Sequence, residues 1–427
     1  MRSSLALALA SLFFAGAFAA TLRAETLNDC FTDALKRSET LAESGESIVQ
    51  AEEQLRQARG AILPNLTLNY SYLRQDDHAY TPALAQSDPA NQTDLNVTLA
   101  QPLFRGFAEY AALREVKDSL AAARDADRWA GIQLYQDVAQ VFFTVLSLER
   151  SKQLIEDEIK LYDGRIAELK DFLAIGRSRP SDVETVQADQ ALLQATEVQL
   201  DEQVAVEREA LAFLTGKGPD LALSADEAIP ADAGSLDGLL KGLDGRPDLH
   251  AAIEKNEAAK ELVAVNHGAH LPSIDLLGHW YASPRTGTDS PISWDGSIMA
   301  TLPLFEGFTL VSRDRSAESQ QRQAELELSR QRRMAESAVR TAWRTLNGDL
   351  AQITAFDRGF TLANKAYESL KRDYEHGLDT NQDVLLALTS SRDAQRSLEA
   401  AKFAARNDNE QLQALAGRRM DLVQDRQ

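Results

Sequence analysis

Hydrophobic residues recur at steps of three and four along two long stretches of this 427-residue chain. The first stretch, 107–174, and its return segment, 183–214, keep this spacing over many turns. A sustained seven-residue repeat predicts helices that pack in left-handed supercoils. The stretch 107–174 holds 68 residues and no proline, so one continuous helix would be roughly 100 Å long. A matching stretch runs from about 308 to 375, and helices of this length must project from any globular domain.

Apolar and polar residues alternate in four shorter stretches, which is typical of β-strands with one apolar and one polar face. The alternation runs over 66–72, 95–99, 274–276 and 294–301. These strands approach the roughly 9–11 residues that a tilted membrane-crossing strand needs. Aromatic residues near strand ends are expected at a membrane interface. They are Tyr70, Tyr72, Trp280, Tyr281 and Trp294.

The chain contains two copies of one structural unit. The block Pro-Leu-Phe-Arg-Gly-Phe at 102–107 recurs as Pro-Leu-Phe-Glu-Gly-Phe at 303–308, an offset of 201 residues, and Gly176 recurs as Gly377 at the same offset. Each copy is predicted to form a helix, two strands, a very long helix, a turn and a return helix. In the first copy the opening helix is expected over about 27–61, because a proline follows shortly after.

This pattern divides the chain into a leader, two repeats, a connecting segment and a tail. Glycines and prolines break the helical pattern in the connecting segment. The expected segments are a signal peptide at 1–24, a first repeat at 25–216, a connecting segment at 217–247, a second repeat at 248–417 and a tail at 418–427.

The N-terminus has the parts of a secretory signal peptide. Arg2 is followed by an apolar run at 5–20 and by small residues that permit cleavage after Ala19 or Ala24. Because the run is shorter than the roughly 20 residues of a spanning helix, cleavage is favoured over a membrane anchor. The single cysteine, Cys30, excludes a disulfide framework and is expected to be a buried or half-buried thiol.

Composition and net charge limit the classes of protein to which this chain can belong. Alanine, leucine, glutamate, glutamine and arginine abound, as in long helices, whereas aromatic residues make up only 7% of the chain. The formal net charge of −20 becomes −22 if cleavage after residue 24 removes two arginines. Such a surface repels nucleic acid and anionic lipid and favours cations.

Four amphipathic strands cannot close a membrane barrel alone, because the smallest such barrel has about eight strands. Their apolar faces and open edges therefore need partners. Either the chain oligomerises to pool its strands, or the strands form a small soluble sheet. The aromatic residues near the strand ends favour the first alternative, and the second stays open.

Short sequence blocks follow one another in a duplicated order along the mature chain. They are Thr26-Leu27, Ala34-Leu35, Gln57-Ala58-Arg59, Leu63-Pro64, Gln101-Pro102-Leu103-Phe104 with Gly106, Arg246-Pro247-Asp248-Leu249, and Leu302-Pro303-Leu304-Phe305 with Gly307. In these blocks and their order the chain resembles the family of TolC-type outer-membrane factors. One departure is Arg37-Ser38, where the family often has an Asn-Pro pair.

The resemblance implies a fold that is mainly α-helical with a membrane β-barrel. Three chains would contribute twelve strands to one barrel, joined to a periplasmic α-helical tunnel. The segment 217–247 and the tail after Gly417 resemble the mixed equatorial belt around such a tunnel. The implied location is the outer membrane of a Gram-negative-type bacterium. The implied partners are two further copies, outer-membrane lipid, a periplasmic adaptor (membrane fusion) protein, and an inner-membrane pump or ABC exporter.

Glycines and aspartates are paired at the far ends of the long helices. Gly176 and Gly377 are expected to end these helices in the left-handed conformation. Asp182 and Asp383 follow six residues later, at the start of each return helix. An aspartate there caps free N–H groups and interacts favourably with the helix dipole, which alone would explain both residues. The alternative is that carboxylates from three chains meet in one narrow ring.

By resemblance, Asp182, Tyr374 and Asp383 match positions that form the periplasmic constriction of the family. Asp379 stands where a TolC-type tip can carry arginine, and Leu386 stands at a second acidic position. The expected constriction here therefore consists of Asp182, Tyr374, Asp379 and Asp383, and its locking contacts must differ from those of the family.

Arg177 and Arg179 are candidate partners for these carboxylates. The turns at the tips lie at the free ends of long helices, where an adaptor protein has access. The expected docking residues are Gly176, Arg177, Gly377 and Leu378.

The sequence contains no catalytic constellation, and neither enzymatic activity nor a cofactor is expected. His267 and His270 are three residues apart, but two ligands without a third bind a metal weakly. The preferred function is a passive outer-membrane channel, the exit duct of a tripartite efflux pump or a type I secretion system. The alternative is a periplasmic coiled-coil scaffold or adaptor protein without a pore.

Overall fold

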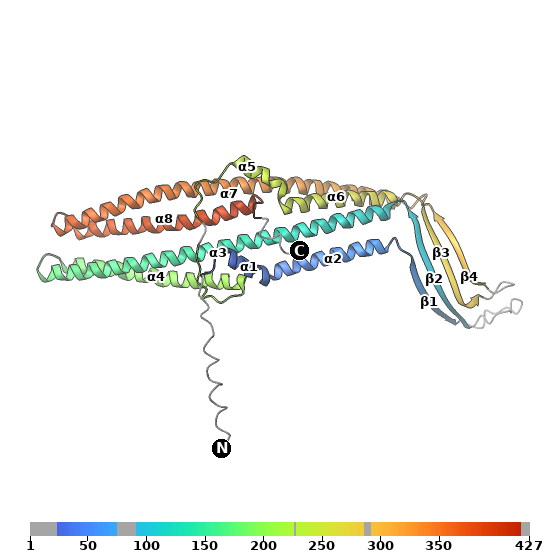
Figure 1. Cartoon of the computed structure of the whole chain (residues 1–427), viewed down its shortest axis with the longest axis horizontal. Helices are drawn as coiled ribbons and strands as arrows, with labels where there is room; N and C mark the ends of the chain where they lie inside the picture. The colour runs from blue at the N-terminus through green and yellow to red at the C-terminus, as the bar shows by residue number, and fades with distance from the viewer. Residues whose placement is uncertain (1–23, 75–90, 226–227, 286–291, 420–427) are drawn as a thin grey trace, which may run out of the picture. The chain divides into compact units, whose positions relative to one another are not determined.

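The computed structural model describes residues 24–74, 91–225, 228–285 and 292–419. Residues 1–23 of the predicted signal peptide and residues 420–427 of the predicted tail lie outside this part. The elements are α1 (Leu27–Arg37), α2 (Glu39–Gly60), β1 (Asn65–Arg74), β2 (Asn91–Arg105), α3 (Ala108–Ala174), α4 (Pro180–Thr215), α5 (Leu236–Lys241), the 3₁₀ turn η3 (Gly242–Gly245), α6 (Pro247–Gly268), β3 (Ser273–Arg285), β4 (Ile292–Thr301), α7 (Thr309–Glu375) and α8 (Asn381–Leu415) (Figure 1).

The two longest helices confirm the prediction from the heptad spacing. α3 and α7 have 67 residues each, which corresponds to about 100 Å of helix. Each is joined by a short turn to a return helix, α4 with 36 residues and α8 with 35 residues. None of the described helices combines the length and the apolar character that crossing a membrane requires.

The opening helix was expected to be continuous over 27–61, and this expectation is wrong. Ser38 has an extended backbone, with φ −61° and ψ 112°, and it separates α1 from α2. The two helices differ in what they bury: α1 buries Leu27, Cys30, Phe31 and Ala34 within only 11 residues. The longer α2 buries two side chains. A break at Ser38 lets the short apolar face of α1 pack independently of α2.

The four strands form one antiparallel sheet in the order β1-β2-β3-β4 (Figure 1). Its register places apolar residues opposite one another across all four strands. Leu68 lies opposite Val97, Val97 opposite Trp280, and Trp280 opposite Trp294. Because side chains alternate along a strand, these residues share one face. The sheet therefore has a continuous apolar face.

The opposite face of the sheet is polar. Asn69 donates to Asn96 and Thr98 at 3.1 and 3.2 Å. Tyr281 lies on this polar face, only 8% exposed, with its hydroxyl donating to Asp295 at 2.8 Å. Its ring is therefore buried, whereas Trp280 and Trp294 are 55% and 70% exposed. Because Trp280 and Tyr281 are consecutive in β3, strand alternation places their rings on opposite faces.

The repeated Pro-Leu-Phe-X-Gly-Phe block turns the chain from a strand into a long helix. In both copies glycine and the following phenylalanine have left-handed backbones, with φ of 65° and 62° at Gly106 and Phe107. At Gly307 and Phe308 the values are 59° and 66°. A Cβ at Gly106 would lie 2.1 Å from the carbonyl oxygen of Gly268, so no other residue fits there without a backbone shift.

The described elements divide between two compact units. The unit that we call the tip unit contains the free ends of the helical hairpins, and the sheet unit contains the four strands. The tip unit covers Met1–Ser38, Leu134–Ala233 and Thr345–Gln411, and the sheet unit covers Glu39–Gln133, Gly234–Arg344 and Leu412–Gln427.

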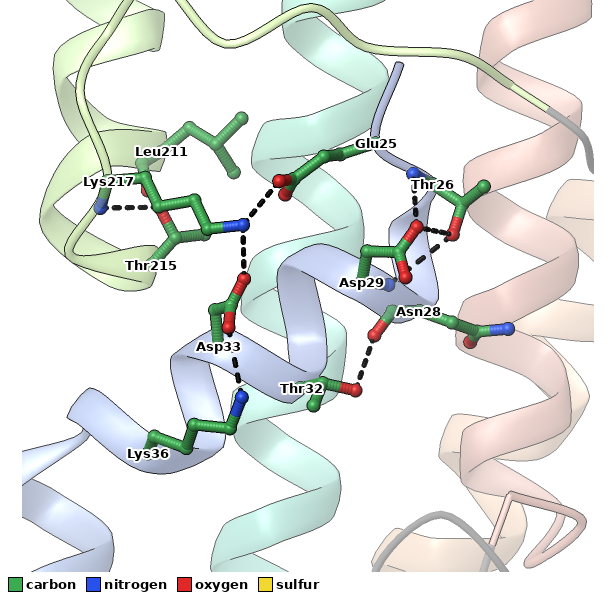
Figure 2. Close-up of polar contacts among 10 residues, drawn as sticks. All are labelled: Glu25, Thr26, Asn28, Asp29, Thr32, Asp33, Lys36, Leu211, Thr215 and Lys217. Carbon is green, nitrogen blue, oxygen red and sulfur yellow. Dashed lines mark hydrogen bonds and ion pairs between the residues drawn. The ribbon is translucent and has the colours of Figure 1, made fainter. Parts of the chain in front are cut away.

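In the tip unit, ion pairs tie the segment before α1 to the end of α4 (Figure 2). The ammonium group of Lys217 contacts the carboxylates of Glu25 and Asp33, the latter at 2.5 Å. Asp33 and then Glu25 raise the pKa of Lys217, and Lys217 in turn lowers the pKa of Asp33. Cys30 is fully buried in α1, as predicted, and burial raises the pKa of its thiol to about 12.

Candidate functional site at the helical tips

Both long helices end in the same left-handed turn. Gly176 and Gly377 have φ values of 75° and 76°, which confirms their prediction as helix-ending glycines. In each turn the next residue, Arg177 or Leu378, donates its N–H to the carbonyl five residues earlier, at 2.8 and 2.9 Å. These bonds satisfy carbonyls that the helix end would otherwise leave free.

The two predicted aspartates cap the return helices. Asp182 accepts hydrogen bonds from the backbone N–H of Arg179 at 3.0 Å and from the Ser178 hydroxyl at 3.2 Å. Asp383 accepts from the N–H and hydroxyl of Thr380, and the Thr380 hydroxyl accepts from the Asp383 N–H at 3.3 Å. Reciprocal bonds of this kind stabilise a helix start by roughly 0.5–2 kcal/mol. The capping role of both carboxylates is therefore established by geometry.

An apolar cluster joins the two hairpins in the tip unit. Tyr374, near the end of α7, is half-buried against this cluster. Burial of each leucine- or valine-sized side chain contributes roughly 1.5–3 kcal/mol, so the cluster holds the hairpins together. Its buried members are Tyr162, Ile166, Leu169, Val183, Val186, Leu385 and Leu388.

Arg165 of α3 lies at the edge of this cluster and is only 7% exposed. Its Nε and Nη2 donate to the side-chain oxygen of Asn381 at 3.1 and 2.8 Å, and its Nη1 donates to Glu168 at 2.7 Å. Its guanidinium carbon lies 4.1 Å from the centre of the Tyr374 ring. Arg165 thus connects α3 with the end of α7 and the start of α8.

The remaining predicted tip residues are more exposed. The side chain of Arg177 donates to the main-chain carbonyl of Glu375 at 3.0 Å and lies over the Phe172 ring at 5.0 Å. Leu378 is 75% exposed. Asp379 is half-buried and makes no hydrogen bond or ion pair with any residue that the structure describes. The structure brings Tyr374 against Arg165, whereas Asp182 and Asp383 each bond within their own turn.

A second buried polar contact lies further along the same helices. Glu158 of α3 is 1% exposed and pairs with Arg396 of α8. Burial raises the pKa of Glu158 above its ordinary value, although Arg396 acts in the opposite direction. Neither this pair nor Arg165 was predicted from the sequence. A signal was present for Arg165, which stands three residues after Tyr162 and four before Leu169, on the apolar side of α3.

His267 and His270 form no metal centre with other residues of the described part. No group of three His, Cys, Asp or Glu side chains in that part is arranged to hold a metal ion. His270 instead contacts the Asp314 carboxylate at 2.7 Å.

Comparison with known proteins identifies the family. The model of the family described as outer membrane efflux protein matches residues 31–217 and 241–418, the greater part of the chain. The chain belongs to the outer membrane efflux protein family. The family model divides its match into two segments, each of which falls largely within one of the repeats seen in the sequence.

Relatives and solved structures agree with this family. The chain is 24% identical to outer membrane protein TolC of Vibrio cholerae over 91% of this chain and 90% of the relative. It is 22% identical to the proteases secretion protein PrtF of Dickeya chrysanthemi over 88% and 85%. The crystal structure of the outer membrane protein VceC from Vibrio cholerae covers 92% of this chain and 96% of its own, with 22% identity and a TM-score of 0.79.

These findings confirm the resemblance, the fold class and the outer-membrane location that the sequence predicted. The chain is an outer-membrane exit channel component for efflux or secretion. Its family consists of channels rather than enzymes.

Proposed function

We propose that three copies of this chain form one passive exit duct. Each copy would contribute its four strands to a twelve-stranded barrel and its two hairpins to a periplasmic tunnel. The observation that carries this proposal is the sheet itself, whose outer strands β1 and β4 each pair with a single neighbour among the strands that the structure describes. Its apolar face is exposed in the single chain: Leu66 and Trp294 are 69% and 70% exposed. A lipid-facing closed barrel would cover both features.

The duct would receive its cargo from an inner-membrane pump or ABC exporter through a periplasmic adaptor protein. The exposed turns at Gly176–Arg177 and Gly377–Leu378 support docking there, because they are the free ends of long hairpins. No enzymatic step is part of this function.

The tips would also form the constriction of the closed duct. In a ring of three copies, Asp182, Asp379 and Asp383 would supply nine carboxylates. Close pairs of carboxylates repel by about 1 to 4 kcal/mol, depending on the local dielectric. The main-chain N–H groups that bind Asp182 and Asp383 offset part of this repulsion. Asp379 makes no such bond to a described residue and would contribute most to the selectivity for cations.

Assembly is the direct test. The mature protein should fractionate with the outer membrane, require detergent for extraction and give a trimer in native mass spectrometry. The alternative, a periplasmic coiled-coil scaffold or adaptor without a pore, predicts a protein that is soluble without detergent and gives no conductance in planar bilayers. A soluble monomer would therefore refute the duct.

A further inference from the structure

A groove with a volume of about 340 Å³ lies between α3 and α8, inside the tip unit. Pockets that bind small molecules have volumes of roughly 300–1,000 Å³, so the groove has room for a ligand at the small end of that range. Most of its wall is apolar. Phe143 and Leu148 of α3 lie on one side, and Ala400, Phe403 and Ala404 of α8 lie on the other.

Polar side chains meet at one end of this groove. Nδ2 of Asn407 donates to the side-chain oxygen of Gln140 at 2.8 Å and to a carboxylate oxygen of Asp408 at 3.2 Å. All three residues line the groove. These two bonds identify which end of the Asn407 amide carries the N–H groups, because both partner atoms are acceptors.

The oxygen of the same amide lacks a donor. Asn407 is only 8% exposed, and its Oδ1 is buried without a hydrogen bond from any residue that the structure describes. A buried amide oxygen without a donor is unfavourable, and folded proteins satisfy nearly all such atoms with protein, water or a ligand. A donor at this end of the groove would therefore be bound favourably.

This end of the groove is also acidic. Asp408 is half-buried and forms no ion pair with a described residue, and it contacts Asp349 of α7. Burial and then this contact raise the pKa of Asp349 to about 7. Arg406 lies over the Phe403 ring at 5.1 Å, but no lysine, arginine or histidine is among the described residues that line the groove. Two carboxylates in contact without a cation favour a positively charged ligand.

The groove suits an organic cation better than a metal ion or water. A metal ion needs several oxygen, nitrogen or sulfur ligands, and no three His, Cys, Asp or Glu side chains of the described part are arranged to hold one. A water molecule could donate to Asn407, but it would neither compensate the charge of Asp408 nor cover the apolar walls.

We propose that the groove binds a small amphipathic amine, with its ammonium group at Asn407 and Asp408 and its apolar body against Phe143 and Phe403. The ammonium N–H groups supply the donor that Oδ1 of Asn407 lacks, and its charge compensates Asp408. The apolar body leaves water when it packs on the two rings. The inference goes beyond the proposed duct and does not depend on it, because one chain forms the whole groove.

Protection of a cysteine locates the ligand. Ala404→Cys places a thiol on the wall of the groove, where Ala404 is exposed. Cys30 does not compete for the reagent, because it is buried and the pKa of its thiol is raised to about 12. In the full-length protein in lipid nanodiscs, phenethylammonium should slow the reaction of this thiol with N-ethylmaleimide. The concentration that halves the rate gives the dissociation constant.

Matched probes and variants test the recognition. Phenethyl alcohol has the same ring and chain without the charge and should protect at least ten-fold more weakly. Asp408→Asn should weaken protection by phenethylammonium roughly 10- to 100-fold, and Asn407→Leu roughly two- to ten-fold, because each removes an acceptor of the ammonium group. Asp357→Asn removes an exposed acid of α7 outside the groove and should leave protection unchanged.

Ala355→Cys is the control for non-specific protection, because Ala355 is an exposed alanine of α7 that does not line the groove. The proposal is overturned if phenethylammonium protects neither thiol or both equally. It is also overturned if Asp408→Asn keeps full protection, or if the alcohol protects as well as the amine. A thiol at position 404 that resists the reagent without any amine would mean that another chain covers the groove, which also overturns the proposal.

Discussion

Replacement of Arg165 by methionine should loosen the closed tip without affecting the barrel. Methionine keeps an unbranched apolar stem in a site where arginine is only 7% exposed, but it removes every hydrogen bond of the guanidinium group. Asn381, itself 6% exposed, then loses both donors to its side-chain oxygen. Tyr374 loses the cation above its ring.

The cost can be worked out contact by contact. A buried acceptor left without a donor costs about 1–3 kcal/mol, and the lost cation–π contact costs about 0.5–2 kcal/mol. The ion pair with Glu168, which is 28% exposed, adds no more than about 1 kcal/mol. Part of this cost is regained through the apolar side chain of methionine. A net loss of about 2–4 kcal/mol per chain is expected, confined to the contact between the hairpins.

Hydrogen exchange measures this loss locally. Amides in the last turn of α7 and the first turn of α8 should exchange roughly 30- to 1,000-fold faster than in the parent, because each 1.4 kcal/mol is a factor of ten. Resting conductance in planar bilayers should rise. Arg177→Met is the matched control, because Arg177 is exposed and the hydrogen bond that its side chain makes to a described residue goes to a main-chain carbonyl.

The reasoning would be refuted by an Arg165→Met trimer whose tip exchange and conductance both equal those of the parent. The double variant with Asn381→Ala refines the test. If the two side chains act through their shared hydrogen bonds, the second substitution should cost much less in the methionine background than in the parent.

Three other tests follow from the same unit. Asp383→Asn should lower trimer stability by no more than about 1 kcal/mol per chain, because an asparagine oxygen can accept the same bonds from Thr380 and only the charge at the helix start is lost. It should lower cation selectivity if Asp383 faces the pore, and unchanged selectivity would confine Asp383 to capping. Arg177→Glu should abolish export while trimer yield and membrane insertion stay normal, as checked by cargo export and native gels; intact export would place docking elsewhere. Asp349 contacts Asp408, and burial followed by this contact raises the pKa of Asp349 to about 7. Because the folded state holds this proton more tightly than the unfolded chain, stability should be full below about pH 4 and should decrease as the pH rises towards 7. Asp349→Asn should therefore raise the melting temperature at pH 8 and flatten its dependence on pH, and an unchanged melting profile would contradict the assignment.

The periodicity of the sequence predicted the long helices, the strands and both tip turns, because these depend on neighbouring residues. Gly377 and Asp383 specify their turn through local backbone conformation and capping, and such signals are readable without a partner. The break at Ser38 was missed, since no proline or glycine marks it. The bonds between Arg165 and Asn381 join residues 216 positions apart, and a heptad repeat does not determine which polar groups meet across paired helices.

The internal duplication gives the hairpin contact a further consequence. The bonds that Arg165 makes with Asn381 and Tyr374 join the two hairpins of one chain. At the repeat offset of 201 residues, the counterparts of these three residues are Ala366, Pro180 and Leu173. These residues have no side-chain groups that could form the same bonds. In the proposed ring of three copies, contacts inside a chain would alternate with equivalent contacts between chains, and only the former would be joined by arginine. The two hairpins of one copy would then move as a pair, and the closed tip would separate most readily between neighbouring copies.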